Sequence, residues 1–347
     1  MASSQHVPPH SELNDTSTVT LNDIMRASLS LKDVVKHTPL DVSERLTQEL
    51  GVPVLLKRED QQVCRSFKVR GAYAKMSALS AQSRQQGVVC ASAGNHAQGV
   101  AFACAHLNVR GTIYLPSTTP RQKRKRIAAI GGEWVEQVIV DGGFDRANAL
   151  ATEAARVTGR EYVHPYDDPG TIAGGGTIGV ELAEQIPADT SCVLVPVGGG
   201  GLIAGIATAL SHLRPDVRVI GVEPYGAASM QRAFDEGGPT ALDRVDSFVD
   251  GTAVGTVGTL PFQLAQENVS SLVSVPEGAV CTEMVSLYQT DGIIAEPAGA
   301  LASTAARTLL TDPKRRAELT GSDEGSIVCV VSGGNNDLSR YAEVVER

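Results

Sequence analysis

The sequence predicts an α/β protein built on mainly parallel sheets, and three observations support this prediction. Short, continuously apolar runs are typical of strands that are covered on both faces. These runs alternate with helical patterns, as in strand–helix–strand units. Several runs lead directly into glycine-rich segments, at the position where open α/β sheets bind ligands. The expected strands are residues 52–56, 88–91, 112–115, 134–140, 192–197, 218–222, 272–275 and 327–331.

Helical patterns lie between these strands, for example at residues 94–106, 120–130 and 144–157. Pro120 follows Ser117, Thr118 and Thr119. We therefore expect Pro120 in the first turn of a helix that a hydroxyl side chain caps.

The length of 347 residues is enough for about two domains with sizeable cores. The segment from residue 87 to residue 165 contains one compact strand–helix pattern, and a second pattern follows it. We expect a large domain from residues 21–86 and 166–347 and a small domain from residues 87–165. The polar start, residues 1–20, is expected to be disordered.

Composition excludes several functional classes. A net charge of −9 argues against a general nucleic-acid or anionic-membrane binder. The sequence contains no apolar run long enough to span a bilayer and no apolar leader near Met1. The six cysteines are scattered without a CxxC pair, which indicates a reduced compartment, without a disulfide framework or a zinc ribbon. We therefore expect a cytoplasmic protein.

Four consecutive glycines, Gly198–Gly201, stand between an expected strand and an expected helix. Bare backbone N–H groups at a helix N-terminus are suited to binding phosphate. The segment is neither a GxGxxG motif in a dinucleotide-binding context nor a GxxxxGK[ST] motif, so a ligand with one terminal phosphate is favoured. A tight strand–helix turn without a ligand is the alternative.

Three further segments contain residues suited to chemistry. Lys68 lies between Phe67 and Val69, where partial desolvation would lower its pKa for Schiff-base formation; a surface lysine is the alternative. The segment from Ser92 to Gln98 predicts an anion site at a helix start, or a simple capped helix. The segment from Ser332 to Asn336 follows the last expected strand.

Together and in this order, these segments resemble the fold-type II pyridoxal-phosphate enzymes, in particular the threonine/serine dehydratases (threonine ammonia-lyases) and the related serine racemases. The resemblance extends from about residue 37 to residue 336. It implies a tryptophan synthase β-like fold, with two open, twisted, mostly parallel sheets flanked by helices. The segments that carry it are Lys57–Asp60, Ser66–Ala72, Ser92–Gly99, Ile172–Thr177, Gly198–Leu202, Glu296–Ala300 and Ser332–Asn335.

The resemblance also implies a role for individual residues around pyridoxal 5′-phosphate. Lys68 is the expected catalytic residue, which forms the Schiff base and removes the substrate Cα proton. The expected cofactor contacts are Phe67 beside the ring, Asn95 at the 3-oxygen, Gly198, Gly199, Gly200, Gly201 and Leu202 at the phosphate, and Ser332 at the pyridine nitrogen. The expected contacts to the substrate carboxylate are Ser92, Asn95 and His96.

The implied reaction is β-elimination, which would convert L-threonine, and also L-serine, to a 2-oxo acid and ammonia. The alternatives are a serine racemase, a dehydratase of a bulkier or acidic 3-hydroxy amino acid, and a non-catalytic protein that binds a phosphate ligand. Ala93 stands where serine racemases use a serine to reprotonate Cα, which favours elimination. Glu223 matches a cation-site carboxylate of the family and is the one candidate metal ligand, although Ser229 replaces an aspartate of that site.

Relatives in this family imply a homodimer or homotetramer that acts on a small amino acid. Only eleven residues follow Asn336. We therefore expect no C-terminal regulatory domain.

Overall fold

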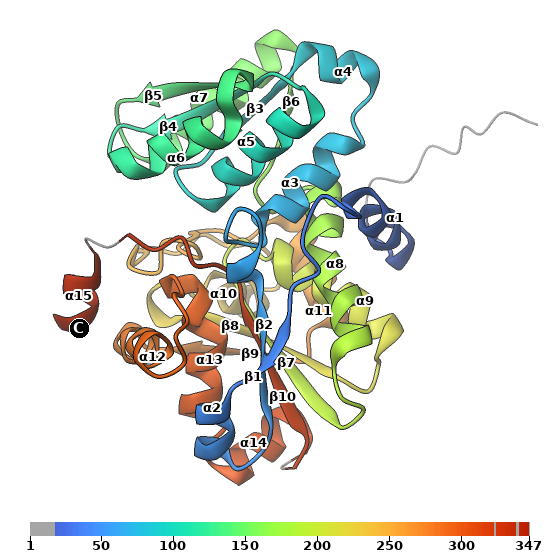
Figure 1. Ribbon diagram of the computed structural model, residues 1–347, viewed down its shortest axis with the longest axis vertical. Coiled ribbons are helices and arrows are strands. Elements are labelled where there is room, and N and C mark those ends of the chain that lie inside the picture. The colour runs from blue at the N-terminus through green and yellow to red at the C-terminus, as the bar shows by residue number, and fades with distance from the viewer. Residues whose placement is uncertain (1–17, 323, 338–339, 347) are drawn as a thin grey trace, which may run out of the picture.

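The computed structural model describes residues 18–322, 324–337 and 340–346, and it contains two separate sheets (Figure 1). The six-stranded sheet has the order β1-β2-β10-β7-β8-β9, and the four-stranded sheet has the order β5-β4-β3-β6. All strand pairs are parallel except β1 with β2. The predicted fold class is confirmed.

The strands of the larger sheet are β1 (Leu40–Val42), β2 (Val54–Arg58), β7 (Thr190–Pro196), β8 (Arg218–Pro224), β9 (Ser271–Val275) and β10 (Ser326–Val331). Those of the smaller sheet are β3 (Val88–Ala91), β4 (Gly111–Pro116), β5 (Val135–Val140) and β6 (Glu161–Tyr162). The sequence did not reveal β1 and β6, because segments of three and two residues carry no recognisable period.

Fifteen α-helices connect and cover the strands of the described residues. Those up to the end of the smaller sheet are α1 (Leu21–Leu31), α2 (Glu44–Leu50), α3 (Lys68–Ser77), α4 (Ala81–Gln86), α5 (Asn95–Leu107), α6 (Arg121–Gly131) and α7 (Phe144–Thr158). The others are α8 (Pro169–Gln185), α9 (Gly201–Leu213), α10 (Ser229–Glu236), α11 (Thr259–Asn268), α12 (Glu277–Gln289), α13 (Pro297–Leu309), α14 (Pro313–Thr320) and α15 (Tyr341–Glu346).

The larger sheet is buried on both faces, as its continuously apolar strands require. Leu55, Val193 and Val328 pack with residues of α8 and α9 on one face. Their chain neighbours Leu56 and Cys329 pack with residues of α12 and α13 on the other face. Successive side chains of a strand point to opposite faces, so one strand contributes to both cores.

The start of the chain and the start of α6 differ from expectation. Val19 is buried, and Thr20 caps α1 in a reciprocal capping box with Asp23, so the disorder expected for residues 1–20 does not reach them. Residues 1–17 lie outside the described residues. Pro120 is the N-cap of α6 instead of its first residue, and no side chain of the described residues caps this helix. The helix therefore begins one residue later than predicted, at Arg121.

Candidate active site

The polar segments singled out in the sequence lie at carboxyl ends of strands, between the two sheets (Figure 1). Ser332 and Gly333 follow β10 and reach the chain before α3: Ser66 pairs with Gly333 in an antiparallel bridge. The Phe67 N–H donates to the Ser332 carbonyl at 3.1 Å. This bridge brings Lys68, the first residue of α3, to the end of β10.

Lys68 directs its amine into the protein. Nζ donates to the Pro165 carbonyl at 2.9 Å and lies 5.0 Å from the centre of the Phe67 ring. Burial lowers the pKa of Lys68 to about 8, and the charge of Glu296 acts in the opposite direction. A surface lysine does not fit this environment. An amine with such a pKa is partly neutral near pH 7 and can act as a nucleophile or a base.

The tetraglycine forms the turn from β7 into α9 and admits no larger residue. A Cβ on Gly198 would lie 2.8 Å from Thr252 Cα, and one on Gly201 would lie 2.7 Å from the Tyr166 carbonyl oxygen. A Cβ on Gly199 would overlap the Tyr166 ring. Gly200 has a φ of +90°, in the left-handed region that favours glycine.

This turn has the form of a phosphate cradle. Among the described residues, no side chain caps α9, so the first N–H groups of this helix are left for another acceptor. Leu202, in the first turn of α9, is buried. Bare backbone, free N–H groups and the positive end of the helix dipole fit a phosphate dianion. Together with the amine of Lys68, they fit pyridoxal phosphate.

A second helix N-terminus, that of α5, contains Asn95 and His96. Ser92 Oγ accepts from the Gly94 N–H at 3.2 Å and shapes the turn that follows β3. His96 is 3 % exposed, and its Nε2 donates to the Val163 carbonyl at 2.7 Å. Its Nδ1 has no hydrogen-bond partner in the part of the chain that the structure describes. Burial, helped by the charge of Lys68, lowers the pKa of His96 to about 3. The imidazole is therefore neutral, with a bare acceptor at Nδ1.

The remaining predicted residues, Ser332 and Glu223, are buried near the carboxyl ends of β10 and β8. Ser332 is buried, and its hydroxyl donates to the Ala298 carbonyl at 3.3 Å. Glu223, at the end of β8, is fully buried and accepts from the N–H groups of Met230 and Gln231 at 2.7 and 2.9 Å. Burial raises the pKa of Glu223 to about 7. Within the described ranges, no group of three or more His, Cys, Asp or Glu side chains could hold a metal.

Sequence reasoning gave no role to two residues that contact Asn95. Glu296 accepts from Asn95 Nδ2 at 2.6 Å, and Asn335 Nδ2 donates to Asn95 Oδ1 at 2.8 Å. Both belong to segments that carry the family resemblance, Glu296–Ala300 and Ser332–Asn335. An acidic residue directly before a proline at a helix start was the available signal for Glu296.

The segment that follows β6 contacts both Lys68 and the tetraglycine turn. Lys68 donates to its Pro165 carbonyl, and the Tyr166 ring covers Gly199. His164 Nδ1 accepts from the Tyr166 and Asp167 N–H groups at 3.3 and 2.7 Å, which fixes the bend of this segment. The Tyr166 ring therefore lies against the candidate phosphate cradle.

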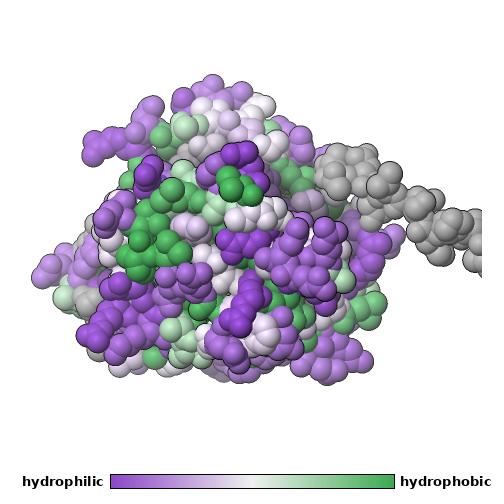
Figure 2. All heavy atoms as spheres, turned by 90° about the horizontal axis from the view of Figure 1, so that it is seen from above, coloured by the Kyte–Doolittle hydropathy of each residue, from purple (hydrophilic) through white to green (hydrophobic). Residues whose placement is uncertain are grey.

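Helix α6 begins with a basic run, residues 121–126, and two of these side chains contact other parts of the chain. Lys123 bridges to Asp250 of the long loop that precedes α11, with 3.1 Å between Nζ and Oδ2. Arg126 Nε donates to Gln98 Oε1 at 2.7 Å. The view from above shows mostly hydrophilic side chains with smaller apolar areas between them (Figure 2).

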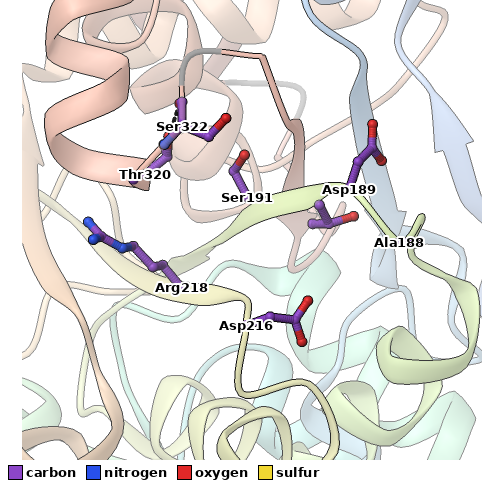
Figure 3. A pocket seen from close by; sticks show the side chains of 9 residues that line it. Ala188, Asp189, Ser191, Asp216, Arg218, Thr320 and Ser322 are labelled. Atoms are coloured by element: carbon purple, nitrogen blue, oxygen red, sulfur yellow. Dashed lines mark hydrogen bonds between the residues drawn. The ribbon is translucent and has the colours of Figure 1, made fainter.

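A cavity of about 350 Å³ lies at the other end of the strands of the larger sheet, away from the candidate active site (Figure 3). Asp189, Ser191, Asp216 and Arg218 are among its lining residues, near the amino ends of β7 and β8. Because open α/β sheets bind ligands at the carboxyl ends of their strands, this cavity is not the candidate active site.

In the part of the chain that the structure describes, no helix is long and apolar enough to cross a membrane.

The sequence is 44% identical over 335 residues to the L-threonine dehydratase biosynthetic IlvA of Bacillus subtilis (strain 168), covering 96% of this chain and 77% of that one. It is 49% identical over 334 residues to the protein of the same name from Mycobacterium leprae (strain TN), covering 96% and 76%.

Solved structures of the same fold cover nearly all of the chain. The processed form of threonine deaminase isoform 2 from Solanum lycopersicum has a TM-score of 0.86 and 39% identity, and the match covers 99% of this chain and 98% of that one. Maize serine racemase has a TM-score of 0.87 and 28% identity, with 95% and 97% covered. Residues 31–333 match the family described as pyridoxal-phosphate dependent enzyme, and the chain belongs to that family.

Proposed function

We propose that this enzyme dehydrates and deaminates L-threonine to 2-oxobutanoate and ammonia, and L-serine to pyruvate and ammonia. The observation that carries the proposal is the position of the Lys68 amine, with a lowered pKa, beside the segment that covers the tetraglycine turn. The proteins named L-threonine dehydratase, at 44% and 49% identity, support the choice of substrate.

Pyridoxal phosphate, when bound, supplies the electron sink that makes the substrate Cα proton acidic. Lys68 is the proposed covalent attachment point and general base, because a pKa of about 8 leaves part of its amine neutral. The Pro165 carbonyl accepts from Nζ and directs the amine into the site. Phe67 covers the amine on one side.

The two helix N-termini take the two anionic groups. Gly198–Gly201 and Leu202, with the free N–H groups of α9, are proposed to hold the cofactor phosphate. Ser92, Asn95 and His96, at the start of α5, are proposed to hold the substrate carboxylate, mostly through their backbone N–H groups. Asn95 is also proposed to donate to the cofactor ring oxygen, and the Ser332 hydroxyl to face the ring nitrogen. Such fixed donors orient the reacting groups before the chemical step.

A substrate panel tests the proposal. Purified enzyme saturated with cofactor is given L-threonine, L-serine, phenylserine or 3-hydroxyaspartate, and the 2-oxo acid and ammonia are measured. We expect the highest kcat/KM with L-threonine. Activity confined to phenylserine or hydroxyaspartate would contradict the proposed substrate. A protein that binds no cofactor and shows no visible absorption band would support the non-catalytic alternative.

Serine racemisation is the second candidate, because the fold is also similar to that of maize serine racemase. Racemisation needs an acid–base group on the face of the substrate opposite Lys68. The resemblance places this group at position 93, where the methyl group of Ala93 can neither donate nor accept a proton. Elimination is therefore favoured.

We further propose that the enzyme is a cytoplasmic homodimer or homotetramer. The family resemblance supports the assembly, and the scattered cysteines without a CxxC pair support a reduced compartment. Light scattering of the purified protein tests the assembly, and a monomer would contradict it.

A further inference from the structure

Glu296 is a buried carboxylate whose partners are neutral. It is the N-cap residue of α13 and is 6 % exposed. Oε1 accepts from Asn95 Nδ2 at 2.6 Å, and Oε2 accepts from the Asn335 N–H at 3.2 Å. Among the described residues, no Lys, Arg or His forms an ion pair with it. Because buried carboxylates are usually paired with a cation, this arrangement needs an explanation beyond stability.

The contacts of Asn95 supply such an explanation. Asn95 Oδ1 accepts from Asn335 Nδ2 at 2.8 Å, and Asn335 Nδ2 also donates to the Cys64 carbonyl at 2.8 Å. Exchanging the two ends of the Asn95 amide would place an oxygen against the carboxylate and an NH2 group against another NH2 group. The orientation of the amide is therefore fixed. One of its two N–H bonds serves Glu296, and the other is left for a further acceptor.

The place of the carboxylate beside Asn95 depends on neighbouring glycines. A Cβ on Gly333 would overlap Oε1 and lie 3.0 Å from the carboxyl carbon, and one on Gly251 would lie 3.7 Å from Oε1. The main chain of Glu296 is fixed as well, because its N–H donates to the Gly333 carbonyl at 3.1 Å. Position 333 thus requires a glycine for the carboxylate to stand where it does.

The contact also joins the two sheets. Asn95 begins the helix that follows β3 of the smaller sheet, whereas Glu296 and Asn335 follow elements that pack on or belong to the larger sheet. The pairs are 201 and 240 residues apart in sequence. The direction of the Asn95 amide is therefore set by residues on the side of the larger sheet. These contacts form only when the two sheets lie in the relative positions seen here.

We propose that Glu296 is a positioning residue that acts through Asn95: its carboxylate aims the free N–H of the Asn95 amide at the ring oxygen of the cofactor. This inference rests on the role of Asn95 in the proposed function. Burial and the nearby Asp250 raise the pKa of Glu296 to about 7, and Lys123 and the two hydrogen bonds oppose this. The ionised carboxylate of Glu296 accepts hydrogen bonds more strongly than the neutral acid. A glutamine at position 296 would place its own NH2 group against the donors of Asn95 and Asn335.

A double-mutant cycle tests the inference on cofactor binding. Wild type, Glu296→Gln, Asn95→Ala and the double variant are titrated with pyridoxal phosphate, and the Kd and visible spectrum of each are recorded. We expect Glu296→Gln to raise the Kd roughly tenfold, the effect of one lost buried hydrogen bond, and to shift the absorption band. In the Asn95→Ala background, Glu296→Gln should change neither quantity.

Two further variants complete the test. Glu277→Gln is the matched control, because Glu277 also accepts from a backbone N–H, that of Gly226 at 2.7 Å, but lies outside the site; its Kd should equal that of wild type. If Glu296→Gln does not fold, Asn335→Ala removes the donor to Asn95 Oδ1, and we expect the same spectral shift. The inference is refuted by additive effects in the cycle, or by an unchanged Kd and spectrum in Glu296→Gln or in Asn335→Ala. These readouts need no turnover, so failure to deaminate threonine would refute only the proposed function.

Discussion

Gly199 gives a direct test of how the tetraglycine turn is built. An alanine at this position would place its methyl group inside the Tyr166 ring, and the three closest atoms all belong to that ring. Restoring a carbon–carbon separation of about 3.5–4.0 Å requires the ring to move by more than roughly 1 Å. Overpacking of this kind costs about 1–3 kcal/mol of unfolding free energy. We expect Gly199→Ala to be destabilised by that amount.

The Tyr166 ring can be removed independently, which makes the prediction specific. In a Tyr166→Ala background the obstacle is gone, so Gly199→Ala should cost almost nothing there. The coupling energy between the two changes should then equal the cost of about 1–3 kcal/mol. Urea unfolding of the four proteins, each saturated with cofactor, measures these free energies.

Gly201→Ala is the matched control in the same turn. Its Cβ would lie 2.7 Å from the Tyr166 carbonyl oxygen and 3.1 Å from Tyr166 Cβ, and both atoms remain when Tyr166 becomes alanine. Removing the ring should therefore not rescue Gly201→Ala. Equal penalties for Gly199→Ala with and without the ring would refute the explanation of this turn by ring contact.

Three other predictions concern single residues. Lys68→Ala should abolish turnover and the visible band, and borohydride reduction with peptide mapping should label Lys68; label on another lysine would refute its assignment. Wild type should form negligible D-serine from L-serine alongside measurable pyruvate, and Ala93→Ser should raise D-serine formation; comparable yields from wild type, measured by chiral chromatography, would contradict this. The pKa of Glu223 is raised on folding, from 4.5 to about 7, so its stabilising contribution is present at low pH and is lost as the pH rises through 7. The stability of wild type relative to Glu223→Gln should fall by about 2–3 kcal/mol between about pH 5 and pH 8, measured by urea unfolding; a pH-independent difference would contradict the raised pKa.

Much of the fold could be predicted because its information is local. Strands such as Val88–Ala91 are short apolar runs, and the sequence placed that one correctly to the residue. The turn at Gly198–Gly201 could be predicted for the same reason: the left-handed backbone at Gly200 and the close neighbours of Gly198 need residues without a side chain. Pro120 shows the limit of local rules, since the hydroxyl cap expected ahead of it is absent and the helix starts without one.

The groups that orient the candidate catalytic residues are not local in sequence. Lys68 donates to a carbonyl 97 residues away, and Asn95 contacts a carboxylate 201 residues away. A backbone carbonyl such as that of Pro165 leaves no mark in the sequence, because every residue has one. Glu296 does leave a mark, but its type alone does not distinguish a helix-start carboxylate in water from one buried against an amide. Only the placement of the two sheets decides between them.

That placement explains why the site lies where it does. Lys68 belongs to a helix between the sheets, its amine is held by the segment that follows the smaller sheet, and its backbone neighbour Phe67 is held by Ser332 at the end of the larger one. Movement of the sheets relative to each other would change both sets of contacts, because Lys68 is joined to the smaller sheet through Pro165 and to the larger one through Phe67, and Asn95 contacts Glu296 and Asn335 across the sheets. Cofactor orientation and sheet placement are therefore coupled through the same few hydrogen bonds, and a variant that weakens one should be detectable in the other.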